Sequence, residues 1–371
     1  MTSKIYDIFG KLIRVNFDNS FGSSVLQKEL SLYPIIAQDK NPDLDIFCQS
    51  HQYYVNQGFT NPSIHQELDN GFIANFGSSQ VEFLFDNKNL KRINFIIKPS
   101  SSKIKKYIQK LRSIQYCSVE ESIGQIFHEL VLIPSVYFQT NQFLLHASAL
   151  KSSKSDVILI GGTGGVGKTS LELELCLKHG FQFVSDDICV ASQNGWIWSN
   201  LAYPKIYAYN LENNDKLTKK LFLNSSLTNR LHWALNQKRG KNKVRRRISP
   251  EKLYDSFSQE GGLVKKYLIL ARAEQDEIQV SKISHEVAVH MSLPIIEAEY
   301  NIFNNHILWH QFNSYLQDKE PYTSLQNILI RWRELALQAL SQSSCFLIVI
   351  PLRIEHSKFK DKVASIIRNM T

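Results

Sequence analysis

The chain has 371 residues, a formal net charge of +9 and a pI near 9.1. Hydrophobic residues make up 43% and charged residues 21%, so the chain can bury ordinary cores and is long enough for two domains. It contains no run of about 18 apolar residues and no apolar signal segment at its start, so we expect a cytoplasmic protein without a membrane partner. The five cysteines are scattered and form no C-x-x-C pair, which argues against a zinc site or a disulfide framework.

The first 140 residues predict an α+β module. Two apolar segments flank a turn at Gly10-Lys11, as in a hairpin. Two later segments alternate between apolar and polar residues, and a further segment repeats its apolar residues at helical spacing. The expected strands cover residues 5–9, 12–17, 81–86 and 90–97, and the expected helices cover residues 103–113 and 119–138.

Residues 141–371 predict a second domain of the α/β class, because short apolar strands alternate with helical segments. It begins with the apolar segment 143–150, and a turn leads into a short buried strand at 157–160. The other expected strands cover residues 181–184, 188–191, 196–198, 267–270, 278–280 and 346–350. The expected helices cover residues 168–178, 210–237, 304–316, 325–340 and a short basic segment at the end of the chain.

The segment Gly162-Thr163-Gly164-Gly165-Val166-Gly167-Lys168-Thr169 matches the full phosphate-binding pattern G-x-x-x-x-G-K-[ST]. It lies between an expected strand and an expected helix, which is where this pattern functions. Glycines let main-chain amides curl around phosphate oxygens, and the start of the helix adds a partial positive charge. We expect nucleotide contacts from Gly162, Thr163, Gly164, Gly165, Val166, Gly167, Lys168, Thr169 and Ser170. Lys168 would bridge the β- and γ-phosphates, and the Thr169 hydroxyl would bind Mg²⁺.

The segment after Lys168 carries a local conflict. Residues 171–175 alternate Leu and Glu with a period of two, which favours a strand. No β-branched residue occurs from Ser170 to Gly180, however, and Gly180 is placed as a C-terminal stop. We therefore predict a helix.

Two adjacent carboxylates, Asp186 and Asp187, follow the expected strand 181–184. Such a pair is costly to hold together unless a cation compensates the charges. If strand 181–184 neighbours strand 157–160 and runs parallel to it, both acids approach the glycine-rich segment. One acid would then accept a hydroxyl proton while the other orients metal or water, and the alternative is an exposed turn. His146 is either a satisfied core or turn histidine or a partner for phosphate or the acids.

Part of the positive charge is concentrated between residues 238 and 247. The simplest interpretation is a solvated loop. The alternative is a loop that faces an anion, either the nucleotide or an acidic substrate. A nucleic-acid partner is not expected, because no aromatic stacking platform accompanies the basic residues.

Several of these elements together resemble the catalytic domain of HPr kinase/phosphorylase. They are His146-Ala147-Ser148, the glycine-rich segment with Lys168-Thr169, Gly180, and Ser185-Asp186-Asp187. In that family a His-Gly or His-Ala-Ser element precedes a Walker loop, and a helix ending in Gly and a strand ending in Ala/Ser-Asp-Asp follow. The resemblance covers only residues 144–190, but the order and spacing of the elements agree closely.

The resemblance implies a fold related to phosphoenolpyruvate carboxykinase and a serine kinase that uses ATP and Mg²⁺. It implies that Lys168 binds phosphate, that His146 is an active-site histidine and that Asp186 accepts the substrate's proton. Thr169 and Asp187 would be at the metal, although the resemblance leaves open which acid is the base. Family members tend to form oligomers, so a homo-oligomer is an expectation as well.

The family's Arg-Gly-rich signature after the Asp-Asp pair is not visible in this chain. Residues 194–198 read Asn-Gly-Trp-Ile-Trp instead. The chain looks closer to HPr-kinase-related enzymes of peptide-modification systems, including kinases of lasso-peptide precursors. We therefore expect a serine of a peptide or small protein as the acceptor, rather than HPr, and the runner-up is a small molecule such as free serine.

Other nucleotide-binding classes fit less well. A ParA/MinD-type ATPase has a signature lysine where this chain has Thr163, and a GTPase needs an Asn-Lys-x-Asp motif that the sequence lacks. A nucleotide sensor without catalysis remains an alternative, and it would differ by binding ATP without transferring phosphate.

Overall fold

The computed structural model describes residues 1–50, 60–61, 64–77, 79–97, 115, 118–152, 156–212, 214–223 and 225–370. The chain divides into two compact units of mixed α/β structure. Unit 1 comprises Met1–Asp7, Lys11–Leu132 and Ala202–Leu253, and unit 2 comprises Ile8–Gly10, Ile133–Leu201 and Tyr254–Thr371. These ranges differ from the expected domains 1–140 and 141–371, chiefly because residues 202–253 belong to unit 1. The expected helix 103–113 lies outside the described residues.

Unit 1 is built on a nine-stranded sheet with the order β3-β1-β2-β4-β9-β8-β7-β6-β5. Strand β4 runs parallel to β2 and β9, whereas β9, β8, β7 and β6 form an antiparallel meander. The strands are β1 (Thr2–Ile8), β2 (Lys11–Phe17), β3 (Ile35–Ile36), β4 (Leu44–Gln49), β5 (Thr60–Asn61), β6 (His65–Leu68), β7 (Gly71–Asn75), β8 (Ser79–Asp86) and β9 (Asn89–Ile97). The expected strands 5–9, 12–17, 81–86 and 90–97 are therefore confirmed.

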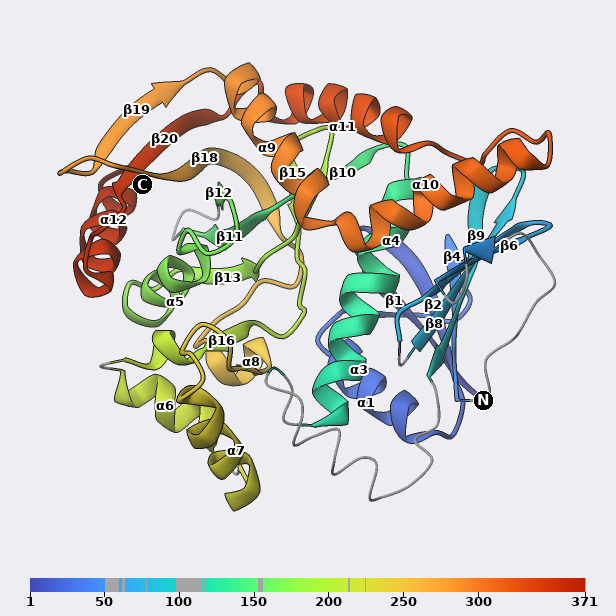
Figure 1. Ribbon diagram of the computed structural model, residues 1–371, viewed down its shortest axis with the longest axis horizontal. Coiled ribbons are helices and arrows are strands. Elements are labelled where there is room, and N and C mark those ends of the chain that lie inside the picture. Colours follow the sequence, from blue (N-terminus) through green and yellow to red (C-terminus); the bar gives the residue numbers. More distant parts are fainter. Residues whose placement is uncertain are drawn as a thin grey trace. The chain divides into compact units, whose positions relative to one another are not determined.

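The helices of unit 1 pack on one another and on this sheet. Helix α1 (Phe21–Leu30) lies beside α3 (Val119–Phe127), which continues into a π-helical turn, His128–Leu132 (Figure 1). Phe95 of β9 packs on Phe127 of α3, with ring centroids 5.6 Å apart. The expected helix 119–138 is confirmed, but it is distorted by the π-helical turn and continues in unit 2 as α4 (Ile133–Ser135) and a 3₁₀ turn, Val136–Phe138.

The third segment of unit 1 contains a small helical pair instead of the single helix expected for residues 210–237. Asn214 and Ser226 each accept a hydrogen bond from a backbone amide three residues later, so each starts a new helix. The elements are β16 (Lys205–Tyr207), a 3₁₀ turn (Ala208–Leu211), α6 (Asp215–Phe222), α7 (Leu227–Gln237), β17 (Arg245–Arg247) and α8 (Pro250–Leu253).

The three arginines at the end of the basic run are buried within unit 1. They form strand β17, which pairs with β16. The guanidinium of Arg247 donates two hydrogen bonds of 2.9 Å to the carboxylate of Glu29, and Arg246 lies over the ring of Trp233 at 5.1 Å. Arg247 and Arg245, which donates to Gln125 Oε1 at 3.3 Å, therefore hold residues 202–253 in unit 1, whereas Arg246 packs within that segment. The expectation of a solvated or anion-facing loop applies only to the lysines and Arg239 before them.

Unit 2 is built on a second nine-stranded sheet. Its main path is β10-β14-β15-β18-β12-β11-β13, and β20 pairs with both β18 and β19. The strands are β10 (Gln142–Leu145), β11 (Ala147–Lys151), β12 (Val157–Gly162), β13 (Gln182–Ser185), β14 (Cys189–Ser192), β15 (Trp196–Trp198), β18 (Gly262–Ala273), β19 (Gln279–Ile283) and β20 (Ser344–Pro351). The expected apolar segment 143–150 is thus two strands, which separate at His146.

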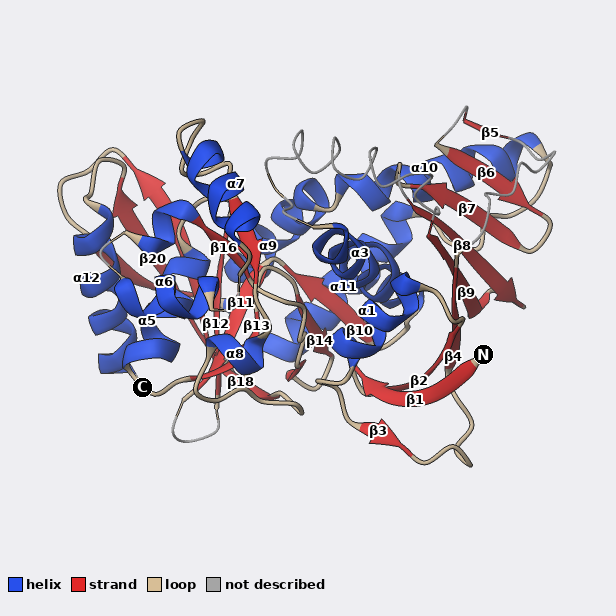
Figure 2. Ribbon diagram, turned by 90° about the horizontal axis from the view of Figure 1, so that it is seen from below, coloured by secondary structure: helices blue, strands red, loops and turns tan. Residues whose placement is uncertain are grey.

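Helices cover both faces of this sheet (Figure 2). Helix α5 (Lys168–Lys178) packs on β11, β12 and β13 and against α12 (His356–Met370), whereas α9 (His285–Glu299) and α11 (Leu325–Leu340) lie on the other face. Helix α10 (Asn301–Leu316) follows α9 directly. The helices expected around 168–178, 304–316, 325–340 and at the chain end are confirmed, and α9 was not predicted. Among the described helices, none combines the length and apolar character that a bilayer crossing requires.

Candidate functional site

Three segments that are distant in the sequence meet at one edge of the unit 2 sheet. Strand β11 runs antiparallel to both β12 and β13, so β12 and β13 run in the same direction with β11 between them. The two strands are parallel but are not neighbours, as the sequence argument had supposed, and their carboxyl ends still lie at the same edge. Because β11 is antiparallel, its first residues lie there too, and His146 directly precedes β11.

The glycine-rich loop, residues 162–169, connects β12 to α5. Gly162 and Gly167 have φ angles of 134° and 115°, a region that side chains strongly disfavour. A Cβ on Gly162 would lie 2.5 Å from the Leu270 carbonyl oxygen, and one on Gly167 would lie 2.5 Å from the ring of Phe359. Both positions therefore require glycine, and the loop path that they allow leads directly into the first turn of α5.

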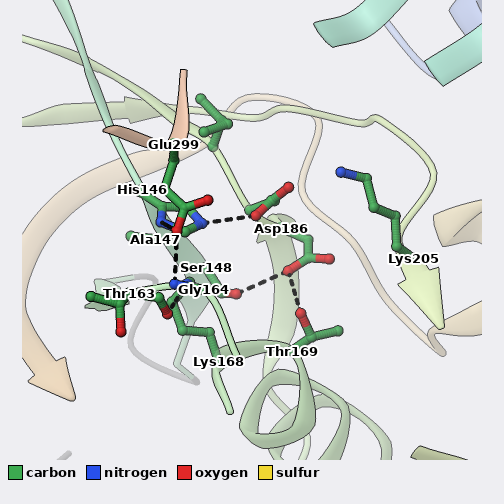
Figure 3. Close-up of polar contacts among 12 residues, drawn as sticks. His146, Ala147, Ser148, Thr163, Gly164, Lys168, Thr169, Asp186, Lys205 and Glu299 are labelled. Carbon is green, nitrogen blue, oxygen red and sulfur yellow. Dashed lines mark hydrogen bonds and ion pairs between the residues drawn. The ribbon is translucent and has the colours of Figure 1, made fainter. Parts of the chain in front are cut away.

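Lys168 lies in the interior of this loop and is only 6% exposed. Its Nζ donates hydrogen bonds to the carbonyl oxygens of Gly162 at 3.0 Å and Thr163 at 3.1 Å (Figure 3). Burial lowers the pKa of Lys168 from its ordinary value, and the carboxylates of Asp187, Asp186 and Glu299 oppose that change. The ammonium group is thus held close to the loop.

Asp186 is buried at the end of β13 and accepts two hydrogen bonds at one oxygen. The donors to its Oδ1 are the hydroxyl groups of Thr169 at 3.0 Å and Ser148 at 3.1 Å (Figure 3). Thr169 comes from the first turn of α5 and Ser148 from β11. Asp186 therefore links α5, β11 and the end of β13. It does so through Thr169, the residue that we expect to bind Mg²⁺.

Asp187 has a different environment from its neighbour. Its φ of 69° is left-handed, which aspartate tolerates better than most residues, and its side chain is 43% exposed. Its Oδ1 lies 2.9 Å from Nε2 of the buried His146. The two acids therefore differ in access: Asp186 faces inward, whereas Asp187 is open to solvent and is oriented by the histidine.

Glu299, the last residue of α9, also reaches the glycine-rich loop, a contact that no pattern in the sequence predicts. Its Oε1 accepts a hydrogen bond of 2.9 Å from the Gly164 amide and lies 3.8 Å from Nδ1 of His146 (Figure 3). A carboxylate oxygen therefore accepts a hydrogen bond from a main-chain amide of the glycine-rich loop, and the sequence pattern of this loop predicts that it binds an anion. This contact is evidence that the loop can accept an anion in this geometry.

A second missed acid, Glu172, is fully buried one turn after Lys168. Its Oε1 accepts a hydrogen bond from the hydroxyl of Tyr254, whose ring stacks on Phe183 at 4.8 Å. Burial and the neighbouring charge of Asp186 raise the pKa of Glu172 well above its ordinary value. The sequence did carry a signal for the burial of Glu172. The alternation of Leu and Glu over residues 171–175 puts leucines on more than one side of the helix, which indicates that polar positions between them are buried as well.

Two further polar contacts flank the loop and were not predicted. Arg272, near the carboxyl end of β18, donates to the Val166 carbonyl oxygen at 3.4 Å and lies over the ring of Phe359 at 5.3 Å. Ser170 Oγ and His356 Nε2 are 3.1 Å apart. Because β18 is parallel to β12, Arg272 arrives at the same sheet edge as the loop and adds positive charge there.

The residues present fit a nucleotide with Mg²⁺. Thr169 Oγ1 and Asp186 Oδ1 are 3.0 Å apart and offer the hard oxygen ligands that Mg²⁺ prefers. Within the described ranges, no group of three or more histidine, cysteine, aspartate or glutamate side chains could hold a metal ion. Mg²⁺ that arrives with a nucleotide needs only one or two protein ligands, because phosphate oxygens and water supply the others.

Comparison with known proteins adds little to this geometry. No protein-family model matches the chain, and no curated protein sequence is significantly similar to it. Among solved structures, the chain is similar to the Hpr(Ser) kinase/phosphatase from Coxiella burnetii. The sequence identity is 12% and the TM-score 0.26, over 62% of this chain and 95% of that chain. A similarity of this size indicates at most a distant relationship of fold.

Proposed function

We propose that the chain is a kinase that transfers the γ-phosphate of ATP, bound with Mg²⁺, to a hydroxyl group. The observation that carries the proposal is the meeting of the glycine-rich loop, the Asp186–Asp187 pair and His146 at one edge of the unit 2 sheet. An anion-binding loop next to paired carboxylates is the arrangement that phosphoryl transfer needs.

The loop and its helix bind the triphosphate. The main-chain amides and the Lys168 ammonium neutralise phosphate charge, and Arg272 adds a further cation at the same edge. Thr169 and Asp186 would hold Mg²⁺, which supplies charge neutralisation at the phosphates when it is bound. In P-loop NTPases the Ser/Thr of the loop and a second-motif aspartate hold Mg²⁺ together, and the hydrogen bond between Thr169 and Asp186 supports the same pairing of roles here.

Asp187 would accept the proton of the attacking hydroxyl. It is the more exposed of the two acids, so an incoming substrate can reach it, and His146 fixes its orientation at 2.9 Å. This division of roles exchanges those that the family resemblance suggests, in which Asp186 is the base and Asp187 lies at the metal. The catalytic set itself, Asp186, Lys168, His146 and Asp187, is unchanged.

The acceptor we propose is a serine of a peptide or small protein, and we propose a cytoplasmic location, where ATP is available. The resemblance to kinases of peptide-modification systems motivates this acceptor class. We test it by incubating the purified chain with Mg²⁺ and γ-labelled ATP, together with a serine-containing peptide library and its alanine-substituted counterpart. Transfer to the serine library alone supports the proposal. ATP binding without transfer to peptides, free serine or solvent would identify a nucleotide sensor instead.

A further inference from the structure

One face of the unit 1 sheet carries polar side chains. Helices α1 and α3 cover the other face, where Phe95 of β9 packs on Phe127 of α3 (Figure 2). Successive side chains of a strand lie on opposite faces, so Asn94, the neighbour of Phe95, lies on the face away from these helices. In the strand ladders Asn94 stands between Phe47 of β4 and Glu82 of β8, which are therefore on that face as well.

A cavity of about 520 Å³ opens on this polar face, and its volume is within the range of small-molecule sites. Strands β4, β6, β8 and β9 all contribute to its lining, which includes Phe47, Leu68, Glu82, Arg92, Asn94 and Ile96. All of these residues belong to unit 1. The described lining of the cavity therefore comes from unit 1, whereas the glycine-rich loop belongs to unit 2.

The cavity contains a buried carboxylate. Glu82 is 8% exposed, and its Oε2 accepts a hydrogen bond of 2.6 Å from Nδ2 of Asn94. Among the described residues, no lysine, arginine or histidine forms an ion pair with Glu82. A carboxylate is costly to bury without a compensating charge, so a positive group that enters the cavity would lower this cost.

An exposed guanidinium lines the same cavity. The guanidinium carbon of Arg92 is 4.7 Å from the centroid of the Phe47 ring. The acid opposite it in the ladder, Asp45, pairs with Arg14 at 3.5 Å instead, and within the described part of the chain Arg92 has no ion pair. Stacking on a ring leaves the edge of a guanidinium open to a carboxylate. Arg92 and Glu82 are diagonal neighbours on adjacent strands, roughly 7–8 Å apart, so one small molecule can contact both.

We propose that this cavity binds a free α-amino acid with an apolar side chain. Its ammonium group would lie at Glu82 and its carboxylate at Arg92, so each charge of the ligand meets the opposite charge of the protein. The side chain of the ligand would lie against Phe47, Leu68 and Ile96. An α-amino acid is the smallest common molecule that supplies all three groups.

Other ligand classes match fewer of these groups. Within the described ranges, no three acidic, histidine or cysteine side chains are grouped to hold a metal ion. A phosphate or a nucleotide would bring negative charge to the buried carboxylate of Glu82. An amine that lacks a carboxylate would leave Arg92 unused. The proposal does not rest on the proposed function, because the cavity and the glycine-rich loop belong to different units.

The test is a thermal-shift titration of the full chain without nucleotide. The probe is L-leucine, and the control ligands are glycine, N-acetyl-L-leucine and L-leucinamide. They lack the side chain, the ammonium group and the carboxylate, respectively. A ligand that binds only the folded state raises the Tm as its concentration exceeds its Kd. We expect L-leucine to bind at least about tenfold more tightly than each control ligand.

Two variants test the residues that we assign to the charges of the ligand. Glu82→Gln and Arg92→Gln should each weaken the binding of L-leucine about tenfold or more. Glu82→Gln retains an oxygen for the hydrogen bond from Asn94, and Arg92 is exposed, so we expect both variants to fold. Asp86→Asn and Lys91→Gln remove charges from exposed positions of the same two strands and should leave binding unchanged.

Three outcomes would overturn the proposal. They are no thermal shift with L-leucine, binding of a control ligand that is as tight as that of L-leucine, and binding at the wild-type level by Glu82→Gln or by Arg92→Gln. None of these outcomes bears on phosphate transfer, because the described residues of the cavity lie outside the glycine-rich loop and the aspartate pair.

Discussion

The backbone amide of Gly164 donates a 2.9 Å hydrogen bond to Oε1 of Glu299. The amide belongs to the loop that we propose to bind phosphate, and the acceptor is a carboxylate from the end of α9. A nucleotide must therefore displace an internal anion before its phosphates can use this amide. Since Glu299 also lies near His146, the displacement changes the surroundings of the proposed proton acceptor at the same time.

Replacing this acid should strengthen nucleotide binding. In Glu299→Ala the competing acceptor and its negative charge are both removed, which together are worth about 1–2 kcal/mol, or roughly tenfold in affinity. Isothermal titration with ADP and Mg²⁺ measures the change. Glu297→Ala removes an exposed carboxylate from the same helix and serves as the control. Unchanged or weaker binding by Glu299→Ala would show that the carboxylate does not compete with phosphate.

Lys168→Ala should abolish phosphate transfer, with a loss of at least about 100-fold, because a preorganised cation disappears from the site of charge development. The matched control is Lys178→Ala, at the other end of α5, whose ammonium pairs with Glu174 instead. Transfer rates are compared at saturating ATP, and circular dichroism checks that both variants are folded. Transfer at the wild-type rate by Lys168→Ala would refute the catalytic role of the loop.

Replacement of Asp186 and replacement of Asp187 should affect different steps, one nucleotide binding with Mg²⁺ and the other phosphate transfer. Asp187→Asn should bind ADP and Mg²⁺ normally but lose transfer by about 100-fold or more, as expected when a general base is removed. Asp186→Asn should instead lose the Mg²⁺ dependence of nucleotide binding, because Asp186 is the acid bonded to Thr169. Titrations with and without Mg²⁺ separate the two effects. The opposite result for the two variants would identify Asp186, and not Asp187, as the general base.

Glu172 should make stability fall with rising pH. Its pKa is raised well above 4.5 in the folded chain, so between these two values the folded state binds one more proton than the unfolded state. The free energy of unfolding then decreases with pH, by at most about 1.4 kcal/mol per pH unit for one proton. Glu172→Gln should flatten this slope in urea unfolding curves measured from pH 5 upward. Identical slopes for both proteins would mean that Glu172 is ionised when folded.

Breaking the Arg247–Glu29 pair should destabilise the protein. Both side chains are buried, and Arg247→Ala would leave the carboxylate of Glu29 without its two charge-assisted hydrogen bonds. Removal of one partner of such a pair costs about 3–5 kcal/mol. Lys243→Ala, in the exposed part of the same basic run, should change the free energy of unfolding by less than about 0.5 kcal/mol. Equal effects of the two changes would contradict the structural role given to Arg247.

The local features of the site could be predicted from the sequence because they depend on neighbouring residues. Gly162, Gly165 and Gly167 have positive φ angles that favour glycine, and the strand before them and the helix after them follow from short apolar patterns. The helix predicted for residues 171–175 is confirmed, although the alternation of Leu and Glu favours a strand. That alternation arises because α5 is covered on one side by the sheet and on the other by α12.

The long-range features could not be predicted. The pairing of His146 with Asp187 depends on β11 lying between β12 and β13, and strand order is not encoded in residue spacing. Glu299 and Arg272 reach the loop from more than 100 residues away, one through an unpredicted helix and one through a parallel strand. The buried Arg245 and Arg247 of β17 look like solvated charges in the sequence, because their acceptors Gln125 and Glu29 lie 120 and 218 residues away.

The separation of Glu29 from Arg247 has a consequence for biosynthesis. The two residues are 218 positions apart, so the ribosome makes the acid long before its guanidinium partner. A nascent chain that holds only the first 132 residues has His128, whose Nε2 lies 3.3 Å from Glu29 Oε2, but lacks the guanidinium that donates two hydrogen bonds to this buried carboxylate. Unit 1 cannot reach its final packing until translation has passed β12 and β13. An excised N-terminal fragment would likewise lack the guanidinium partner of Glu29.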